Sequence, residues 1–435
     1  MADNVFSLEV LRARKGDCSL LHYGTTAKPG LALIDGGPDD VYQPFLRPRL
    51  EELRAERGVD DDEEMVVDLM MLSHIDDDHV AGLLELTGEL IDAKDSEQPR
   101  VVRILDLWHN TFDDIVDNNA DELAGAVNGR FGPASLDGGL PEDVLDELAT
   151  AVAPAVADTV MIVASVPQGR QLRDDAKKLE IALNTEVGGG LIVANEDGEK
   201  LDMGHHLEFT VVGPMLPEIK KLQAAVRAWL KKHPEAQERV TASALASLAD
   251  GSPTNLSSIV VLAESAGRSI LFTGDALGAK ILEGLDMVGR LDENGSIHVD
   301  VLKGQHHGSD RNYTPEFFEH VTADHYVFSG DGEHGNPERA TLEMLADARG
   351  DEPYTIHLTY SIDEIDVERK KDWNAKRGDE QRRHAEKPAV EVRPNWSKAK
   401  HSLAAYLHDN PDVMARVEFV DEGVPHVIDL LGQPL

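Results

Sequence analysis

The residues best suited to chemistry lie in one short segment, 73–79, with the sequence SHIDDDH. His74, Asp76 and Asp78 alternate along it, so in an extended loop their side chains can converge on one point, and His79 follows at the turn into a predicted helix. An acidic loop or an isolated histidine usually binds nothing. Here two histidines flank spaced carboxylates directly after an apolar strand, where so much buried charge without a cation would be costly. Because imidazole and carboxylate groups bind divalent metals, the segment predicts a metal site.

Further polar clusters follow three other predicted strands. They contain Asp275; Lys303 with His306, His307 and Ser309; and the loop from Ser329 to His334. Open α/β sheets gather their functional groups at the carboxyl ends of the strands. We therefore expect these clusters to meet segment 73–79 in one shared site.

The elements that must position these groups are short strands separated by helical patterns. Segments rich in branched or aliphatic residues, most of them closed by turn residues, occur at 6–13, 19–24, 30–37, 66–72, 206–214, 257–265, 268–276, 298–309 and 324–332. Between the two groups of strands, residues 85–203 have the alanine- and leucine-rich pattern of a helical insertion or cap. This order predicts a layered α/β body with the active loops at one edge.

Composition restricts the partners and the ligands. The 435 residues contain 81 acidic and 42 basic side chains, a net charge of −39, so the overall field repels nucleic acid, anionic lipid and phosphate unless local features oppose it. The single cysteine, Cys18, cannot form an internal disulfide or a thiolate cage, which leaves histidine and carboxylate as ligands and fits a reducing compartment. Without a leader pattern or an apolar run of about 20 residues, we expect a cytoplasmic protein that does not contact membrane.

The segment from Arg369 to Lys400 has the opposite charge. It contains eleven Lys or Arg and five Asp or Glu, a net of +6, together with Trp373 and Trp396. Positive charge interleaved with aromatic rings is typical of nucleic-acid binding, so DNA or RNA is a candidate partner through this basic segment. The alternative is a solvated helix or linker that lies against the acidic body.

The motifs, in their order along the chain, resemble a known family. SHIDDDHVAG, NLSSIVVL, ILFTGDA and VLKGQHHGS are similar to the motif series of the metallo-β-lactamase-fold hydrolases, specifically the ComEC-type domain attached to bacterial DNA-uptake channels. The turn at Asp35 resembles the family's early aspartate, and His334–Pro337 resembles its late histidine-proline loop. The resemblance covers about 5–84 and 205–345.

This resemblance implies a fold and a division of the chain. The fold class is α/β, an αββα metallo-β-lactamase sandwich with a helical insertion and a C-terminal extension. The implied parts are a main domain over 1–350, its core at 5–84 and 205–345, the insertion at 85–203, and the extension at 351–435 with its basic segment 369–400.

The resemblance also implies two divalent metal ions at the edge of the sandwich. His74 and Asp76 would hold the first ion, Asp78, His79 and one of His306 and His307 the second, and Asp275 would bridge; we favour His307. A further histidine that the family supplies before the bridging aspartate has no clear counterpart, and the candidates His109, His205 and His206 are each better explained as structural. Zinc and manganese both suit this ligand set.

Two such metals generate hydroxide at neutral pH and stabilise both oxygens of an in-line displacement, which suits phosphodiester cleavage. In this hypothesis a bridging hydroxide attacks phosphorus and Asp78 is catalytic as well as a ligand. Lys303, His306, Ser309 or His334 would contact the phosphate or protonate the leaving oxygen. The sequence thus predicts a metal-dependent hydrolase, a phosphodiesterase or nuclease.

Two other functions stay open, and one motif is set aside. The chain is alternatively a hydrolase of a small phosphoester or ester, with the insertion as a lid, or a non-catalytic metal-stabilised module that binds a protein. The glycines at 330, 332 and 335 match a dinucleotide-binding fingerprint. That match is improbable because a dinucleotide-binding half needs parallel strands that continue after it.

Overall fold

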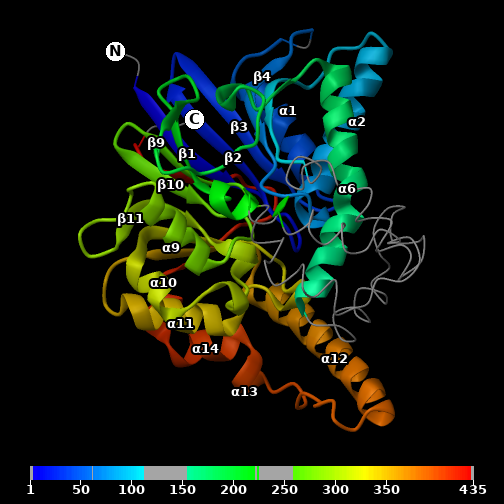
Figure 1. Ribbon diagram of the computed structural model, residues 1–435, viewed down its shortest axis with the longest axis vertical. Helices are drawn as coiled ribbons and strands as arrows, with labels where there is room; N and C mark the ends of the chain where they lie inside the picture. Colours follow the sequence, from blue (N-terminus) through cyan, green and yellow to red (C-terminus); the bar gives the residue numbers. More distant parts are fainter. Residues whose placement is uncertain (1–2, 61, 112–153, 221–222, 225–257, 433–435) are drawn as a thin grey trace.

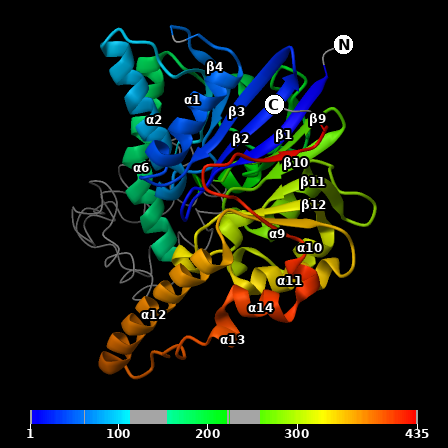
Figure 2. The same cartoon turned by 180° about the vertical axis from the view of Figure 1, so that it is seen from behind.

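Two β-sheets packed face to face form the centre of the molecule, and helices cover their outer faces (Figure 1 and, from behind, Figure 2). The computed structural model describes residues 3–60, 62–111, 154–220, 223–224 and 258–432. The apolar layer between the sheets includes a contact between the Trp108 and Phe209 rings, 5.5 Å apart, one from each sheet. The predicted α/β class with αββα layering is confirmed.

The first sheet has the strand order β15-β1-β2-β3-β4-β5-β6. Its strands are β1 (Asn4–Val10), β2 (Cys18–Thr25), β3 (Lys28–Gly36), β4 (Met65–Met71), β5 (Val102–Trp108), β6 (Ala182–Leu183) and β15 (His426–Asp429). β1, β2 and β3 form an antiparallel meander, whereas β3, β4 and β5 run parallel. The ends of β3 and β4 therefore lie at the same edge of the sheet.

The second sheet has the order β14-β13-β12-β11-β10-β9-β8-β7. Its strands are β7 (Lys200–Asp202), β8 (Glu208–Gly213), β9 (Val260–Ser265), β10 (Arg268–Phe272), β11 (Ile297–Lys303), β12 (Val321–Phe328), β13 (Thr355–Leu358) and β14 (Val417–Phe419). The strands from β10 to β14 are parallel, so the segments that follow β10, β11 and β12 also share one edge.

Amphipathic helices bury the outer faces of both sheets. On the first sheet lie α1 (Arg47–Glu56), α2 (Asp77–Asp95) and α6 (Pro154–Leu179); against the second pack α9 (Gly278–Met287), α10 (Pro315–His320), α11 (Arg339–Arg349) and α14 (Leu403–Asp409). In α2, Val80, Leu83, Leu86 and Leu90 recur at helical spacing and are buried. Among the described helices, none has the length and apolar character that crossing a bilayer requires.

The last part of the chain adds α12 (Ile362–Glu386), α13 (Lys398–His401) and α15 (Pro411–Met414). The far end of α12 projects away from the two sheets (Figures 1 and 2). A capping box fixes its start, because the Ser361 hydroxyl accepts from the Glu364 amide while the Glu364 carboxylate accepts from the Ser361 amide.

The segment predicted as a helical insertion also contributes strands. Of 85–203, residues 112–153 lie outside the described part, but β5 and β6 extend the first sheet and β7 ends the second. Likewise β13 and β14 complete the second sheet and β15 the first, although all three lie in the predicted extension 351–435. Five of these strands have only two to four residues and carry no readable alternation, whereas β5 has seven residues and was missed in the sequence analysis.

Candidate metal centre

The segment that follows β4 forms the first wall of the candidate centre. Asp76 is the N-cap residue of α2, with extended backbone (φ −68°, ψ 148°), yet its carboxylate accepts no capping hydrogen bond. Its Oδ2 atom lies instead 3.5 Å from His74 Nε2. Because aspartate at this position normally caps the helix, its unused carboxylate indicates another role.

Close packing of α2 on the end of β3 brings His79 to its partner. A Cβ atom on Gly82 would lie 2.0 Å from the Gly36 carbonyl oxygen, so glycine is required at this contact. Asp35 sits in the left-handed region (φ 56°) and accepts hydrogen bonds from the Ser73 amide (2.7 Å), the Ser73 hydroxyl (2.7 Å) and His79 Nδ1 (2.9 Å). Asp35 thus holds the His79 proton on Nδ1 and directs Nε2 into the centre.

Asp275 lies at the middle of the centre, directly after β10. Its Oδ1 atom is 3.5 Å from His79 Nε2 and 3.9 Å from His307 Nε2. Its Oδ2 atom is 3.4 Å from His74 Nε2 and 3.6 Å from His306 Nε2. Each oxygen of this one carboxylate therefore faces its own pair of imidazoles.

His306 and His307 are presented by a strained turn, Gln305–Gly308, at the end of β11. Both residues have left-handed backbone, with φ of 45° and 55°, a conformation that side-chain-bearing residues adopt at a cost and that is concentrated at functional sites. His307 is buried with Nε2 3.3 Å from Asp78 Oδ2. The His306 side chain is 43% exposed, and its Nδ1 lies 3.0 Å from Asn312 Oδ1. The turn thus places one imidazole inside the centre and one at its surface.

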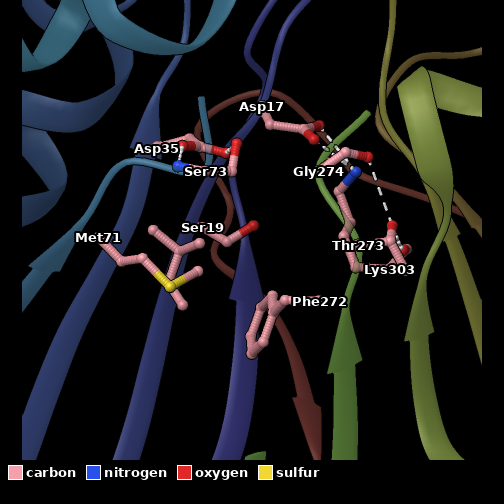
Figure 3. Close-up of a pocket in the computed structure, with 10 residues that line it drawn as sticks. Asp17, Ser19, Asp35, Met71, Ser73, Phe272, Thr273, Gly274 and Lys303 are labelled. Atoms are coloured by element: carbon pink, nitrogen blue, oxygen red, sulfur yellow. Dashed lines mark hydrogen bonds and ion pairs between the residues drawn. The ribbon is translucent and has the colours of Figure 1, made fainter. Parts of the chain in front are cut away.

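Asp17, which the sequence analysis did not select, supports this turn from the first sheet. It is buried at the start of β2 and contacts His307 Nδ1 (3.2 Å) and the Ser329 hydroxyl. Both of its carboxylate oxygens lie 2.8 Å from Lys303 Nζ, and this ion pair lines a small cavity beneath the centre (Figure 3). The only local signal was an aspartate after Gly16 in a turn, which usually indicates a solvated residue.

The expected phosphate contact of Lys303 therefore needs correction. Its ammonium group is buried, paired with Asp17 on the far side of His307, and does not face solvent. The partly exposed side of the centre, where Asp78, Glu333 and His334 lie, is called here the opening. Lys15 lies there, with its side chain 24% exposed and 3.3 Å from Glu333. Burial lowers the pKa of Lys15, but the nearby carboxylates of Glu333, Asp78 and Asp77 outweigh burial and raise it. Lys15 therefore faces these acidic residues.

The remaining predicted residues are distributed around the centre and away from it. His334 is about half exposed, in the left-handed region (φ 59°) of the turn Glu333–Gly335, and Ser309 is buried after the histidine turn. Burial and the charge of Lys15 lower the pKa of His334, whereas Asp78 opposes this, so His334 lies within the influence of the centre.

The three candidates for the missing histidine do not join the group of His74, His79 and Asp275 in the described part of the chain. His205 contacts the Lys28 carbonyl at the opposite end of β3, His206 is exposed, and His109 is buried beside Gly169 of α6. The sequence did not predict the position of His306, which approaches the same Asp275 oxygen as His74.

Buried carboxylates control the protonation of the imidazoles. Against burial and the neighbouring His79, Asp275 and Asp76 raise the pKa of His74 to about 10. Against burial, Asp17 and Asp78 raise the pKa of His307 to about 9. Conversely, and again against burial, the nearby histidines hold the pKa of Asp275 well below its usual value. The centre therefore requires positive charge, from protons or from a cation.

The side chains fit a divalent cation on the evidence of their unused atoms. Within the described chain, five buried ligand atoms that face the centre make no hydrogen bond: His74 Nε2, His79 Nε2, His307 Nε2, Asp76 Oδ1 and Asp275 Oδ1. The ligand atoms of His74, His79 and Asp275 lie within 4.8 Å of one another. Buried polar atoms are rarely left without partners, and nitrogen with oxygen donors is a set that zinc and manganese accept. The buried histidines and aspartates can thus hold metal.

Comparisons with known proteins add little. Neither a protein-family model nor a curated protein matches the sequence. Among solved structures, a protein of Parabacteroides distasonis, provisionally assigned as a metal-dependent hydrolase, matches with a TM-score of 0.30 and 10% identity, over 81% of this chain and 98% of that chain. A likeness at this level assigns neither family nor activity, so the geometry of the centre must support any functional conclusion.

Proposed function

We propose that the chain is a metal-dependent phosphodiesterase, with nucleic acid as its substrate, and that it is related to the ComEC-type hydrolases that its motifs resemble. The observation that carries the proposal is the position of the Asp275 carboxylate, whose two oxygens each face two imidazoles. Two cation positions follow from it. His74, Asp76 and His306 would hold the first, and Asp78, His79 and His307 the second, with Asp275 shared.

Zinc or manganese bound there would supply Lewis acidity and a nucleophile at neutral pH. The chain's own residues hold the ligands in place. Asp35 and Asp17 each accept from the Nδ1 atom of a histidine, so that the Nε2 atoms of His79 and His307 keep their lone pairs toward the centre. Lys15 and His334 are both partly exposed at the opening, and we propose that they contact the phosphate and exchange a proton with the leaving oxygen.

The substrate part of the proposal rests on residues 369–400, the basic arm. Its helix α12 contacts the turn that carries His334, because Lys376 Nζ donates to the His334 carbonyl (3.0 Å) and Arg369 Nε to the Gly335 carbonyl (2.9 Å). Lys370, Lys398 and Lys400 of the arm are exposed. A polyanion bound along the arm would therefore be led toward the opening, against the repulsion of the acidic body.

The arm uses its aromatic residues for its own folding, contrary to the stacking surface expected from sequence. Trp373 Nε1 donates to the Pro394 carbonyl (2.9 Å), and its ring stacks on His401 with centroids 4.1 Å apart. Trp396 packs edge-on against Trp373 at 5.9 Å. These contacts fasten the returning segment onto α12. The arm accordingly offers positive charge rather than base stacking, and we expect binding without strong sequence preference.

A turnover screen tests the chemistry. Single-stranded DNA, duplex DNA, RNA and bis-p-nitrophenyl phosphate are each incubated with manganese, zinc or magnesium, and Asp275→Asn is the control for contaminating activity. We expect turnover of nucleic acid and of the small diester by wild type alone. Cleavage of the small diester but not of nucleic acid would refute nucleic acid as the substrate. Complete inactivity would favour a non-catalytic metal-stabilised module.

A matched pair of charge reversals tests the arm. Lys398→Glu with Lys400→Glu, in the arm, is compared with Lys28→Glu and Lys177→Glu, which are exposed residues elsewhere. Both variants change the net charge equally. We expect only the arm variant to lose DNA affinity and to reduce the salt dependence of binding, by about one unit of slope for each lost phosphate contact. Equal losses in the two variants would show that overall charge, not the arm, controls binding.

A further inference from the structure

A second group of metal-competent side chains lies where the edge strands of the two sheets meet, and it shares no residue with the candidate metal centre. It consists of His357 in β13, Glu418 in β14 and His426 in β15, called here the edge cluster. Its three ligand atoms lie within 4.8 Å of one another. Because β14 belongs to the second sheet and β15 to the first, the edge cluster connects the two sheets.

The ligand atoms of the edge cluster converge on one point. His357 and Glu418 are direct partners across the β13–β14 pair. His357 Nδ1 lies 2.8 Å from His426 Nε2 and 3.6 Å from Glu418 Oε2. Two imidazoles and one carboxylate, with a fourth position for water, form a common zinc ligand set. Zinc bonds of about 2.0–2.1 Å at tetrahedral angles separate two nitrogens by about 3.4 Å, so the rings need to part by only about 0.6 Å.

The second nitrogen of His357 has the partner that a metal ligand requires. A histidine that binds metal through Nδ1 carries its proton on Nε2 and donates it to a neighbouring acceptor. His357 Nε2 lies 3.0 Å from His325 Nδ1, which can accept that proton.

We propose that His357, His426 and Glu418 bind a zinc ion that fastens β15 to β13 and β14. Its role would be to join the last strands of the two sheets, which consist of only three and four residues. β15 is otherwise held by its pairing with β1, in which His426 lies opposite Val10. A metal bond across the sheets would add stability that so short a pairing cannot supply alone. The proposal does not depend on the proposed catalytic function.

Metal content tests the proposal directly. The full chain is stripped with chelator, titrated with zinc, and measured by elemental analysis after removal of free ion. We expect His426→Gln to bind one zinc fewer per chain than wild type. His408→Gln is the matched control, because His408 is 86% exposed on α14, and it should bind as much zinc as wild type. Ions in the candidate metal centre count equally in all three proteins, so the difference is independent of their number.

A second variant guards against misfolding of the first. The Glu418 side chain is 62% exposed, so Glu418→Gln removes a ligand charge without disturbing the core. We expect it to weaken one zinc-binding step about tenfold or more and to reduce the rise in unfolding temperature that zinc produces. Identical zinc content and affinity in wild type, His426→Gln and Glu418→Gln would overturn the proposal.

Discussion

The buried pair of Asp17 and Lys303 gives the sharpest test of how the centre is built. The two side chains come from different sheets and lie 2.8 Å apart, with 7% and 5% of their surfaces exposed. Asp17→Asn removes the carboxylate charge and leaves a buried ammonium group without its counterion. Lys303→Met removes the ammonium group at nearly constant volume and leaves Asp17 with two other partners, His307 and Ser329.

The magnitudes follow from what each change leaves unpaired. Breaking a buried ion pair from one side costs about 3–5 kcal/mol, which we expect for Asp17→Asn. The remaining donors make Lys303→Met milder, about 1–3 kcal/mol. The double variant leaves no buried charge in the pair, so its loss should fall short of the sum of the single losses by about 1–3 kcal/mol.

Urea unfolding of the metal-free proteins measures these free energies of unfolding. Metal titration then shows whether each change also disturbs the orientation of His307. Asp17→Asn removes the charged acceptor of His307 Nδ1, so one metal-binding step should weaken about 10–100-fold. Lys303→Met keeps that acceptor and should leave the affinity nearly unchanged. Strictly additive stabilities, or equal metal affinities of the two single variants, would refute this account of Asp17 as the residue that orients His307.

Three further outcomes are expected. Asp275→Asn should lose both metal-binding steps, whereas Asp78→Asn should lose only one. The reason is that Asp275 faces all four imidazoles, whereas Asp78 faces only those of His79 and His307. Metal analysis of the purified proteins tests this difference. The metal-free protein should lose stability as the pH rises from about 6.5 to about 10, because the pKa values of His74 and His307 are raised to about 10 and about 9 in the folded state, and the stabilisation by their protonated forms is lost across that range. Urea unfolding at pH 7 and pH 10 in chelator checks the sign, and a gain in stability at pH 10 would contradict it. His334→Gln should lower kcat about 100-fold with unchanged metal content, measured with bis-p-nitrophenyl phosphate, and unchanged kcat would remove His334 from the mechanism.

The fold was predictable for most strands long enough to show their pattern, with the exception of β5, whose seven residues were assigned to the helical insertion. All nine segments assigned as strands overlap strands of the two sheets, because apolar runs of five to nine residues between turns are distinctive. β6 has two residues and β14 three, and their place in a sheet depends on neighbours distant in the chain. Tertiary contacts, not local pattern, determine such strands.

The side chains that meet in the candidate centre were predictable from sequence, but the residues that support them were not. The spacing within 73–79 and the strand-end positions of Asp275 and His307 carry local information, and the structure brings these groups together. The pairing of Asp17 with Lys303 joins residues 286 positions apart and leaves no local trace. Lys303 was for that reason expected at the substrate, although its charge is used inside the protein.

The pairing of the buried carboxylates explains why the centre should select a cation. Asp35 accepts from three donors and Asp17 is balanced by Lys303, so both are satisfied within the protein. Asp78 and Asp275 instead face imidazoles, which can balance them only by taking up protons. A divalent ion would replace those protons and leave the histidines neutral as ligands. Metal uptake should therefore release protons, and its affinity should rise with pH as long as those histidines remain protonated in the metal-free protein.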